Sequence, residues 1–269
     1  MSIKLIAMDL DGTLLNSDKL ITPRTMRAVH EAARRGVSVT IATGRMFGSA
    51  EFFGRMIRAN VPLICCNGGL VQGMGAEQPV FVRKLPEPVV RRFLLMCHEK
   101  GWYVQWYVGN EILAEEYRPE FFYAYRTVKD FTVREVGENF LDYTEDVIQC
   151  VVRSLDGSVD EIVKSIRREF ADSIFPQQQT GFSVDLTPPG VHKGVGLEAL
   201  AKHLGVRREE VMACGDSDND LEMLRWAGIG VVPANARPEA KALADYLADS
   251  NDEDGIGKAI EELVLQDGR

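Results

Sequence analysis

Two carboxylates follow a short apolar run near the start of the chain. Residues Ile3 to Met8 read as a buried strand, and Asp9 and Asp11 come next in the stretch MDLDGTLL. A carboxylate can attack phosphorus and form an aspartyl-phosphate, which makes Asp9 a candidate nucleophile. Asp11 can protonate the leaving oxygen and then deprotonate the hydrolytic water. Asp9 and Asp11 alone could also be an ordinary turn after a strand, so phosphoryl-transfer chemistry depends on what lies near them.

Other polar side chains follow further apolar runs of strand type. The strands are predicted over 37–42, 63–66 and 211–214, and the polar residues that follow them are Thr43 with Gly44, Asn67, and Asp216. The carboxyl ends of parallel strands line one crevice of a sheet. We therefore expect these side chains to meet Asp9 at a single edge.

The aspartates of this edge would repel one another without a cation. Asp9, Asp11, Asp216 and Asp220 together carry four negative charges, and Lys193 compensates only one of them. Clustered carboxylates change their protonation unless a cation joins them. Oxygen ligands of this kind suit Mg²⁺, which also binds phosphate. The four aspartates are the predicted metal site, and Lys193 is a point charge for the phosphoryl group and for Asp9.

The composition is that of an ordinary globular protein. The chain has 269 residues, 45% hydrophobic and 26% charged, with a net charge of −9. The negative charge argues against general binding to nucleic acids or anionic membranes. The five cysteines show no metal-ligand spacing and are expected to be reduced thiols. Neither a signal peptide nor a membrane span is recognisable, so we expect a cytoplasmic protein.

Strand-like and helix-like stretches alternate at both ends of the chain but not in its middle. Thr22 and Pro23 can begin an early helix that Gly36 ends. The middle is predicted as helix over 86–101, 121–127 and 159–170, and as strand over 102–108, 147–154 and 182–187. The fold class is therefore α/β: a Rossmann-like parallel-sheet core of residues 1–81 and 188–269, with an inserted α+β cap of residues 82–187.

Four motifs together resemble a known family. DLDGTLL, TGR, GVHKG and GDSDNDLEML occur in the order and approximate spacing of the haloacid dehalogenase (HAD) superfamily. The chain is most similar to its Cof-type phosphatases, the type IIB subgroup with a large α/β cap. This resemblance implies that Asp9 is the nucleophile and Asp11 the acid and base. It also implies that Mg²⁺ is bound by Asp9, the Asp11 carbonyl and Asp216, while Asp220 orients a metal-bound water or Lys193.

The resemblance also assigns the residues around the substrate. Those expected to bind phosphate are Thr43, Gly44, Lys193 and Asn219, and Arg45 is similar to a residue that faces the substrate. Asn67, which follows a predicted strand, is also expected to bind the substrate. Two positions depart from the family pattern. His192 stands where serine is common, and VVPANA around Asn235 replaces the usual Met-Gly before Asn-Ala. Both are expected near the pocket, where they would tune the leaving group.

The leading functional prediction is a Mg²⁺-dependent phosphatase of small phosphorylated metabolites, such as sugar phosphates, nucleotides or phosphorylated vitamins. The insert would be a lid that excludes water and reads the leaving group. A phosphomutase and a non-catalytic regulator that binds phosphometabolites are the alternatives. We expect a monomer or a homodimer whose partner is the small-molecule substrate.

Overall fold

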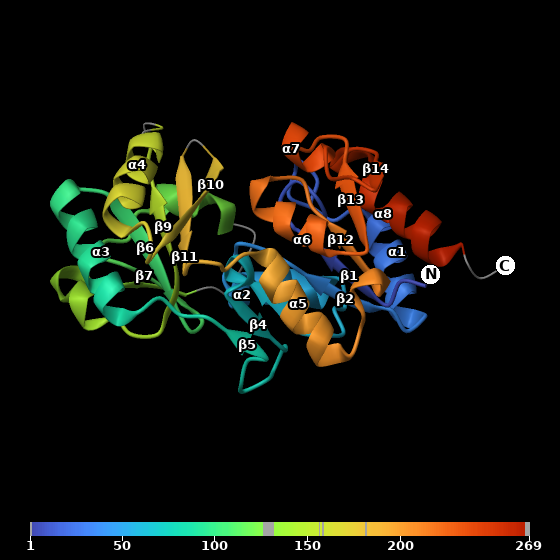
Figure 1. Cartoon of the computed structure of the whole chain (residues 1–269), viewed down its shortest axis with the longest axis horizontal. Helices are drawn as coiled ribbons and strands as arrows, with labels where there is room; N and C mark the ends of the chain where they lie inside the picture. Colours follow the sequence, from blue (N-terminus) through green and yellow to red (C-terminus); the bar gives the residue numbers. More distant parts are fainter. Residues whose placement is uncertain (1, 126–131, 156, 158, 181, 267–269) are drawn as a thin grey trace.

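The protein folds into two lobes that lie side by side (Figure 1). The computed structural model describes residues 2–125, 132–155, 157, 159–180 and 182–266. Both ends of the chain belong to the same lobe, so the middle of the sequence builds the other one (Figure 1). None of the described helices is long and apolar enough to cross a lipid bilayer.

The first lobe contains a five-stranded parallel sheet in the order β14-β13-β12-β1-β2. Its strands are β1 (Leu5–Met8), β2 (Ser38–Ile41), β12 (Val211–Cys214), β13 (Ile229–Pro233) and β14 (Tyr246–Ala248). β1 lies between β2, which follows it closely in the sequence, and β12, which comes about 200 residues later. Such a reversal of strand order is typical of a Rossmann-like sheet. The predicted α/β fold class with a parallel-sheet core is confirmed.

Helices cover both faces of this sheet, which explains why its strands are apolar throughout. Ile6 and Met8 of β1 pack on the side of α1 and α8, whereas Leu5 and Ala7 pack on the side of α5 and α6. The helices are α1 (Pro23–Arg34), α2 (Phe47–Met56), α5 (Lys193–Leu204), α6 (Leu221–Trp226), α7 (Pro238–Lys241) and α8 (Gly255–Ile260). Short helical turns are η1 (Cys66–Gly68), η4 (Arg208–Glu210), η5 (Asp218–Asp220), η6 (Asn251–Glu253) and the π-turn η7 (Glu261–Leu265).

The first helix begins and ends as its sequence predicts. The Thr22 side chain accepts a hydrogen bond from the backbone amide of Thr25, and Pro23 occupies the first turn of α1. Proline suits this position because its missing amide hydrogen would have no partner there. Gly36, with a φ of 88°, lets the chain turn into β2.

The strand predicted over 63–66 does not continue the parallel sheet. β3 (Leu63–Cys65) touches it through a single parallel bridge between Ala42 and Ile64. It instead pairs antiparallel with β4 (Leu70–Gln72), which pairs with β5 (Phe81–Val82). The chain reverses at once because Cys66 and Asn67 adopt left-handed φ values of 51° and 52°.

The second lobe contains a six-stranded sheet in the order β10-β11-β9-β6-β7-β8. All of its pairs are antiparallel except β7 with β8. Its strands are β6 (Tyr103–Val108), β7 (Glu111–Ala114), β8 (Thr132–Glu135), β9 (Val147–Arg153), β10 (Phe175–Thr180) and β11 (Ser183–Thr187). Its helices and turns are α3 (Glu87–Lys100), α4 (Val159–Phe170), η2 (Pro119–Tyr125) and η3 (Gly137–Asp142).

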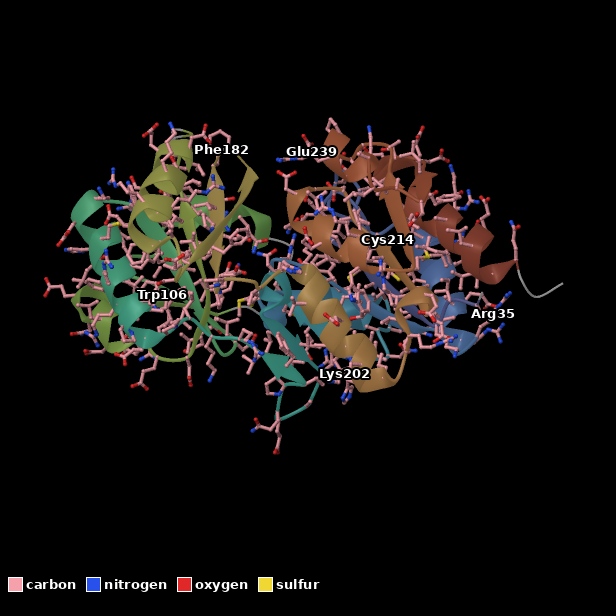
Figure 2. The ribbon with its side chains drawn as sticks, in the orientation of Figure 1. Arg35, Trp106, Phe182, Lys202, Cys214 and Glu239 are labelled. Atoms are coloured by element: carbon pink, nitrogen blue, oxygen red, sulfur yellow. The ribbon has the colours of Figure 1, made fainter. Side chains whose placement is uncertain are left out.

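The two faces of this second sheet differ in chemistry. Trp106 of β6 and Val184 of β11 pack against α3 and α4 in the apolar core of the lobe (Figure 2). Gln105, Gln149 and Asp185 alternate with these apolar residues and are buried on the opposite face. Alternation along a strand therefore gives the lobe one apolar face and one polar face.

The elements of this lobe agree with the sequence prediction only in part. β8 and β10 were not predicted, since β8 is largely exposed and β10 contains Pro176. The predicted helix over 121–127 is the 3₁₀ segment η2 as far as Tyr125, and its last two positions lie outside the described residues. Helix α4 has the predicted bounds.

Candidate active site

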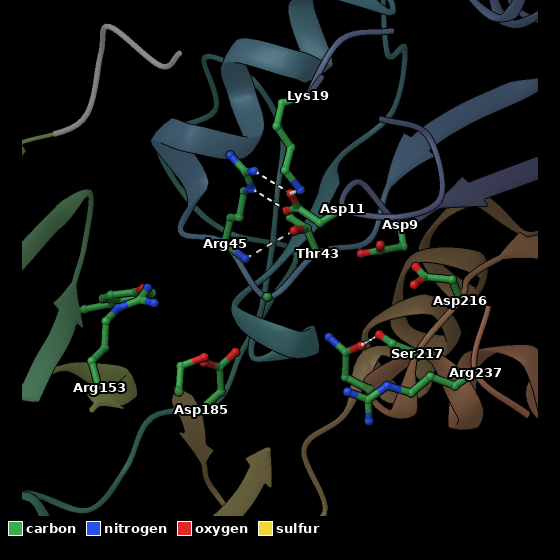
Figure 3. A pocket seen from close by; sticks show the side chains of 14 residues that line it. Asp9, Asp11, Lys19, Thr43, Arg45, Arg153, Asp185, Asp216, Ser217 and Arg237 are labelled. Carbon is green, nitrogen blue, oxygen red and sulfur yellow. Dashed lines mark hydrogen bonds and ion pairs between the residues drawn. The ribbon is translucent and has the colours of Figure 1, made fainter. Parts of the chain in front are cut away.

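A cavity of about 390 Å³ lies between the two lobes. The first lobe contributes Asp9, Asp11, Lys19, Thr43, Gly44, Arg45, Asp216, Ser217, Asn219 and Arg237 (Figure 3). The second lobe contributes Tyr107, Arg153, Ser183 and Asp185. The polar residues predicted to follow β1, β2 and β12 thus meet at one edge of the parallel sheet, although β3 leaves that sheet.

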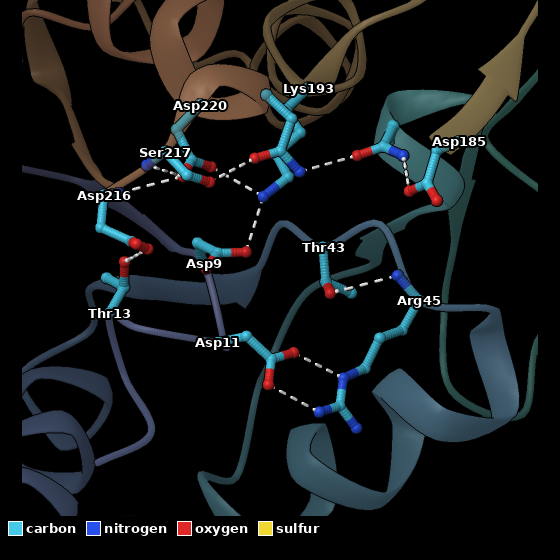
Figure 4. Close-up of polar contacts among 12 residues, drawn as sticks. Asp9, Asp11, Thr13, Thr43, Arg45, Asp185, Lys193, Asp216, Ser217 and Asp220 are labelled. Atoms are coloured by element: carbon cyan, nitrogen blue, oxygen red, sulfur yellow. Dashed lines mark hydrogen bonds and ion pairs between the residues drawn. The ribbon is translucent and has the colours of Figure 1, made fainter. Parts of the chain in front are cut away.

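Lys193 lies buried behind Asp9 and is not among the residues that line the cavity. It is the first residue of α5, its side chain is fully buried, and its Nζ lies 2.6 Å from Asp9 Oδ1 and 2.7 Å from Asp220 Oδ1 (Figure 4). Burial alone would lower the pKa of Lys193, but the two carboxylates raise it above its usual value. Lys193 is therefore a fixed positive charge.

Three carboxylates, two of them buried and one half-buried, lie close together beside this lysine. Asp9, Asp216 and Asp220 each offer an oxygen within 4.8 Å of the others. Burial raises the pKa of Asp9 well above its usual value, and burial together with the charge of Asp220 raises that of Asp216 to about 6. One lysine does not neutralise this cluster, so the donor set fits a hard divalent cation.

Asp220 already uses both of its oxygens. Oδ1 is paired with Lys193, and Oδ2 accepts hydrogen bonds of 3.0 Å from the backbone amides of Asp216 and Ser217. These contacts hold the loop after β12 in place and orient the lysine. Of the four aspartates predicted to bind metal, the side chains that remain open to a cation are those of Asp9 and Asp216. Asp216 Oδ1 also accepts a 2.7 Å hydrogen bond from the Thr13 hydroxyl.

The Asp11 carboxylate faces away from the aspartate cluster (Figure 4). Nε and Nη2 of Arg45 lie 2.9 Å from its two oxygens, and Lys19 Nζ lies 3.0 Å from one of them. Burial alone would raise the pKa of Asp11, but Arg45, assisted by Lys19, lowers it to about 2. Asp11 is therefore ionised in this arrangement. Arg45, predicted to face the substrate, contacts the predicted acid and base.

The predicted phosphate-binding residues surround a close backbone turn. The Thr43 hydroxyl accepts a hydrogen bond from the Arg45 amide at 3.2 Å. A side-chain carbon on Gly44 would lie 3.0 Å from oxygens of Asn67 and Asp185, so only glycine fits without displacing them. The small residue leaves the backbone of this turn accessible from the cavity.

Asn67 connects the two lobes. Its Nδ2 donates to Asp185 Oδ2 at 2.8 Å and to Gln149 Oε1 at 3.2 Å, and its Oδ1 accepts from Asn219 Nδ2 at 2.9 Å. Gln149 in turn donates to the carbonyl of Gly44 at 3.1 Å. Sequence reasoning missed Gln149 and Asp185 because each occupies one polar position in an alternating strand. The only indication in the sequence was that these polar residues alternate with apolar ones along their strands.

The two departures from the family pattern lie differently. Asn235 donates to the Gly12 carbonyl at 2.8 Å, beside the first motif. His192 directly precedes α5. Neither His192 nor Asn235 lines the cavity, so their positions do not support the prediction that they tune the leaving group. All five cysteines are buried and unpaired, as expected of reduced thiols.

The comparison with known proteins agrees with this geometry. The family model for haloacid dehalogenase-like hydrolases matches residues 6–260. The chain belongs to this family. It is 32% identical to a 5-amino-6-(5-phospho-D-ribitylamino)uracil phosphatase of Bacillus subtilis, with 98% of this chain and 96% of that protein covered.

Solved structures of the same family have the same two-lobed architecture. A haloacid dehalogenase-like hydrolase from Bacteroides thetaiotaomicron superposes with a TM-score of 0.88 at 29% identity, covering 97% of this chain and 99% of the other. An HAD subclass IIB sugar phosphatase superposes with a TM-score of 0.79 at 27% identity, covering 96% and 98%. The chain is therefore an enzyme of the HAD phosphatase kind, as the motifs predicted.

Proposed function

We propose that the protein is a Mg²⁺-dependent phosphatase that hydrolyses small phosphorylated metabolites through an aspartyl-phosphate on Asp9. The observation that carries the proposal is that Asp9 and Asp216 line one cavity close to each other, with the buried Lys193 paired to Asp9. A nucleophilic carboxylate, a fixed positive charge and an open pair of metal-binding carboxylates are the groups that phosphoryl transfer requires.

The side chains of Asp9 and Asp216 and the carbonyl of Asp11 would hold Mg²⁺. When bound, the ion supplies positive charge for the phosphoryl oxygens and relieves the repulsion within the aspartate cluster. Asp220 keeps Lys193 against Asp9 and is not needed as a direct ligand, since both of its oxygens have partners. Lys193 thus opposes the rise in the pKa of Asp9 that burial causes, and a bound cation would oppose it further, which favours the ionised nucleophile.

The remaining first-lobe residues bind and orient the substrate. The Thr43 hydroxyl, the Gly44 backbone, Lys193 and Asn219 would receive the phosphoryl oxygens. Asp9 attacks phosphorus in line with the leaving oxygen, and Asp11 supplies a proton to that oxygen. Because Arg45 lowers the pKa of Asp11 to about 2, this acid role requires the Asp11–Arg45 pair to loosen when substrate binds. The paired form supplies the ionised Asp11 with which the second half-reaction begins, but the pair weakens it as a base, so it must also loosen when Asp11 takes a proton from water.

The second lobe would be a cap over the reacting groups, and the division at residues 82 and 187 is part of this proposal. Its wall faces the reacting groups across the cavity, which disfavours folded proteins as substrates (Figure 3). A volume of about 390 Å³ suits a small metabolite. Sugar phosphates, nucleotides and phosphorylated vitamins are the proposed classes, and the printed names of two relatives state a phosphoribitylamino uracil and a sugar phosphate as substrates.

The test is phosphate release from a panel of monoesters, measured with Mg²⁺ and with a chelator. We expect turnover with Mg²⁺, little with the chelator, and none by the Asp9→Asn variant. Isomerised phosphate esters instead of free phosphate would show a phosphomutase. Binding of phosphate analogues without turnover under any metal would show a non-catalytic binding protein.

A further inference from the structure

The second-lobe wall of the cavity carries two opposite charges that the proposed phosphoryl chemistry does not use. Arg153 ends β9, and Asp185 lies within β11 (Figure 3). Both line the cavity on the side opposite Asp9 and Asp216, where the leaving group of a bound monoester would lie.

Strand pairing fixes these two side chains on one face. Arg153 is paired with Ser183, and Asp185 with Val151. Residues two apart on a strand point to the same side, so Arg153 and Asp185 share the polar face of the sheet. Their position therefore follows from the sheet and not from a loop.

Arg153 differs from the other positively charged residues of the lining. The others are each paired with a carboxylate: Lys19 and Arg45 with Asp11, and Arg237 with Asp218. Within the described part of the chain, Arg153 forms no ion pair, and its Nε donates a long hydrogen bond of 3.4 Å to Gln105. Its charge is available to a group in the cavity.

Asp185 is a buried carboxylate with one neutral partner. Asp185 is 7% exposed, and its Oδ2 accepts the hydrogen bond from Asn67 Nδ2. No ion pair joins it to Arg153 or to any other cation among the described residues. A buried carboxylate gains from further donors, so a ligand that offers hydroxyl hydrogens would complete its hydrogen bonding.

We infer that Arg153 and Asp185 form a leaving-group subsite that selects uncharged, hydroxyl-bearing groups, such as a polyol or a sugar, over groups that carry a carboxylate. The inference rests on the proposed phosphatase activity and names its substrate class. A hydroxyl can donate to Asp185 and accept from Arg153, and the hydroxyls of Ser183 and Tyr107 line the same wall. A carboxylate would gain from Arg153 but would be repelled by Asp185.

A pair of substrates isolates this choice. Erythritol 4-phosphate and 4-phosphoerythronate have the same carbon chain and differ in an alcohol against a carboxylate at the far end. Burial raises the pKa of Asp185 to about 6, so an assay at about pH 8 keeps it ionised. With Mg²⁺, the wild-type enzyme is expected to hydrolyse the alcohol with a kcat/KM at least about tenfold higher.

Two variants are expected to change this ratio in opposite directions. Asp185→Asn keeps the shape but leaves Arg153 unbalanced, so the ratio of alcohol to acid should fall at least about tenfold. Arg153→Gln leaves the charge of Asp185 unbalanced, so the ratio of alcohol to acid should rise above the wild-type value. The matched control is Asp172→Asn, a surface aspartate of the same lobe, which should leave the ratio unchanged.

The outcomes separate this inference from the proposed function. Failure of the wild-type enzyme to hydrolyse any monoester with Mg²⁺ would overturn both. Turnover with equal or greater preference for the acid would overturn the subsite alone. So would variants that shift the ratio in the same direction, or that leave it unchanged. Because the two substitutions lie on different strands, failure of one variant to fold still leaves the other to decide.

Discussion

The two lobes present different chemistry to the same cavity. On the first-lobe side, carboxylates that follow β1 and β12 lie beside one lysine, and each is held by hydrogen bonds or ion pairs. On the second-lobe side, polar residues lie along one face of a sheet whose other face is a hydrophobic core. The comparison suggests a division of tasks: one lobe fixes the reacting groups, and the other can vary its face without changing its strand pairing.

The largest effect should come from Asp9. We expect Asp9→Asn to lower kcat by more than about 10³-fold for every monoester, because no other group can take the nucleophile's place. Steady-state phosphate release and circular dichroism would measure activity and folding. Asp18→Asn, an exposed aspartate of the same segment, is the matched control and should retain full activity. Substantial turnover by Asp9→Asn would contradict the view that the first lobe supplies the nucleophile while the second lobe only contacts the leaving group.

Asp11→Asn should show a loss that depends on the leaving group. We expect kcat to fall about 10²- to 10⁴-fold for an alkyl phosphate, whose leaving oxygen needs a proton. The loss should be smaller for p-nitrophenyl phosphate, whose leaving group departs without one. Comparing the two kcat values in one preparation is the measurement. Equal losses on both substrates would contradict the assignment of Asp11 as the acid.

Asp216 should make metal-free stability depend on pH. Its pKa is raised from 3.8 to about 6 in the folded state, so the folded protein binds this proton more tightly. The free energy of unfolding should therefore be highest below the unfolded pKa and fall by up to about 3 kcal/mol as the pH rises through the folded pKa. Urea unfolding in a chelator between about pH 4 and 7 measures this.

The control for this prediction is Asp216→Asn, which cannot ionise. It should lack that fall in stability, and Mg²⁺ should restore stability to the wild-type protein at the upper end of the pH range. If the free energy of unfolding depended on pH in the same way for both proteins, the pKa of Asp216 would not be raised in the folded state.

The smallest effect should come from the contact between the lobes. Gln149→Leu removes the donor to the Gly44 carbonyl and the acceptor for Asn67. We expect a rise in KM of about three- to tenfold, the size of one or two lost hydrogen bonds, with a smaller change in kcat. Steady-state kinetics on one monoester measures both constants. A fall in kcat as large as that of Asp11→Asn would place Gln149 in the chemistry and not in positioning.

The sequence allowed much of the first lobe to be predicted and little of the second-lobe wall. Asp9, Thr43 and Asp216 each follow an apolar run, and a parallel sheet necessarily brings such positions to one edge. Gln149 and Asp185 are single polar residues in alternating strands. Which face of their sheet meets the cavity depends on how the lobes pack, and no local pattern encodes that.

Two further features were also beyond sequence reasoning. The pairing of Asp11 with Arg45 and Lys19 joins separate segments, so its effect on the pKa of Asp11 required coordinates. The direction of β4 depends on the left-handed backbone of Cys66 and Asn67, which is uncommon for residues other than glycine.

Rapid acid quenching during turnover of a ³²P-labelled monoester with Mg²⁺ tests the central claim most directly. The account predicts label bound to the protein, released by hydroxylamine as an acyl phosphate is, mapped to the peptide containing Asp9, and absent from Asp9→Asn. Full phosphate release without any protein-bound label at any quench time, or label mapped to another residue, would contradict it.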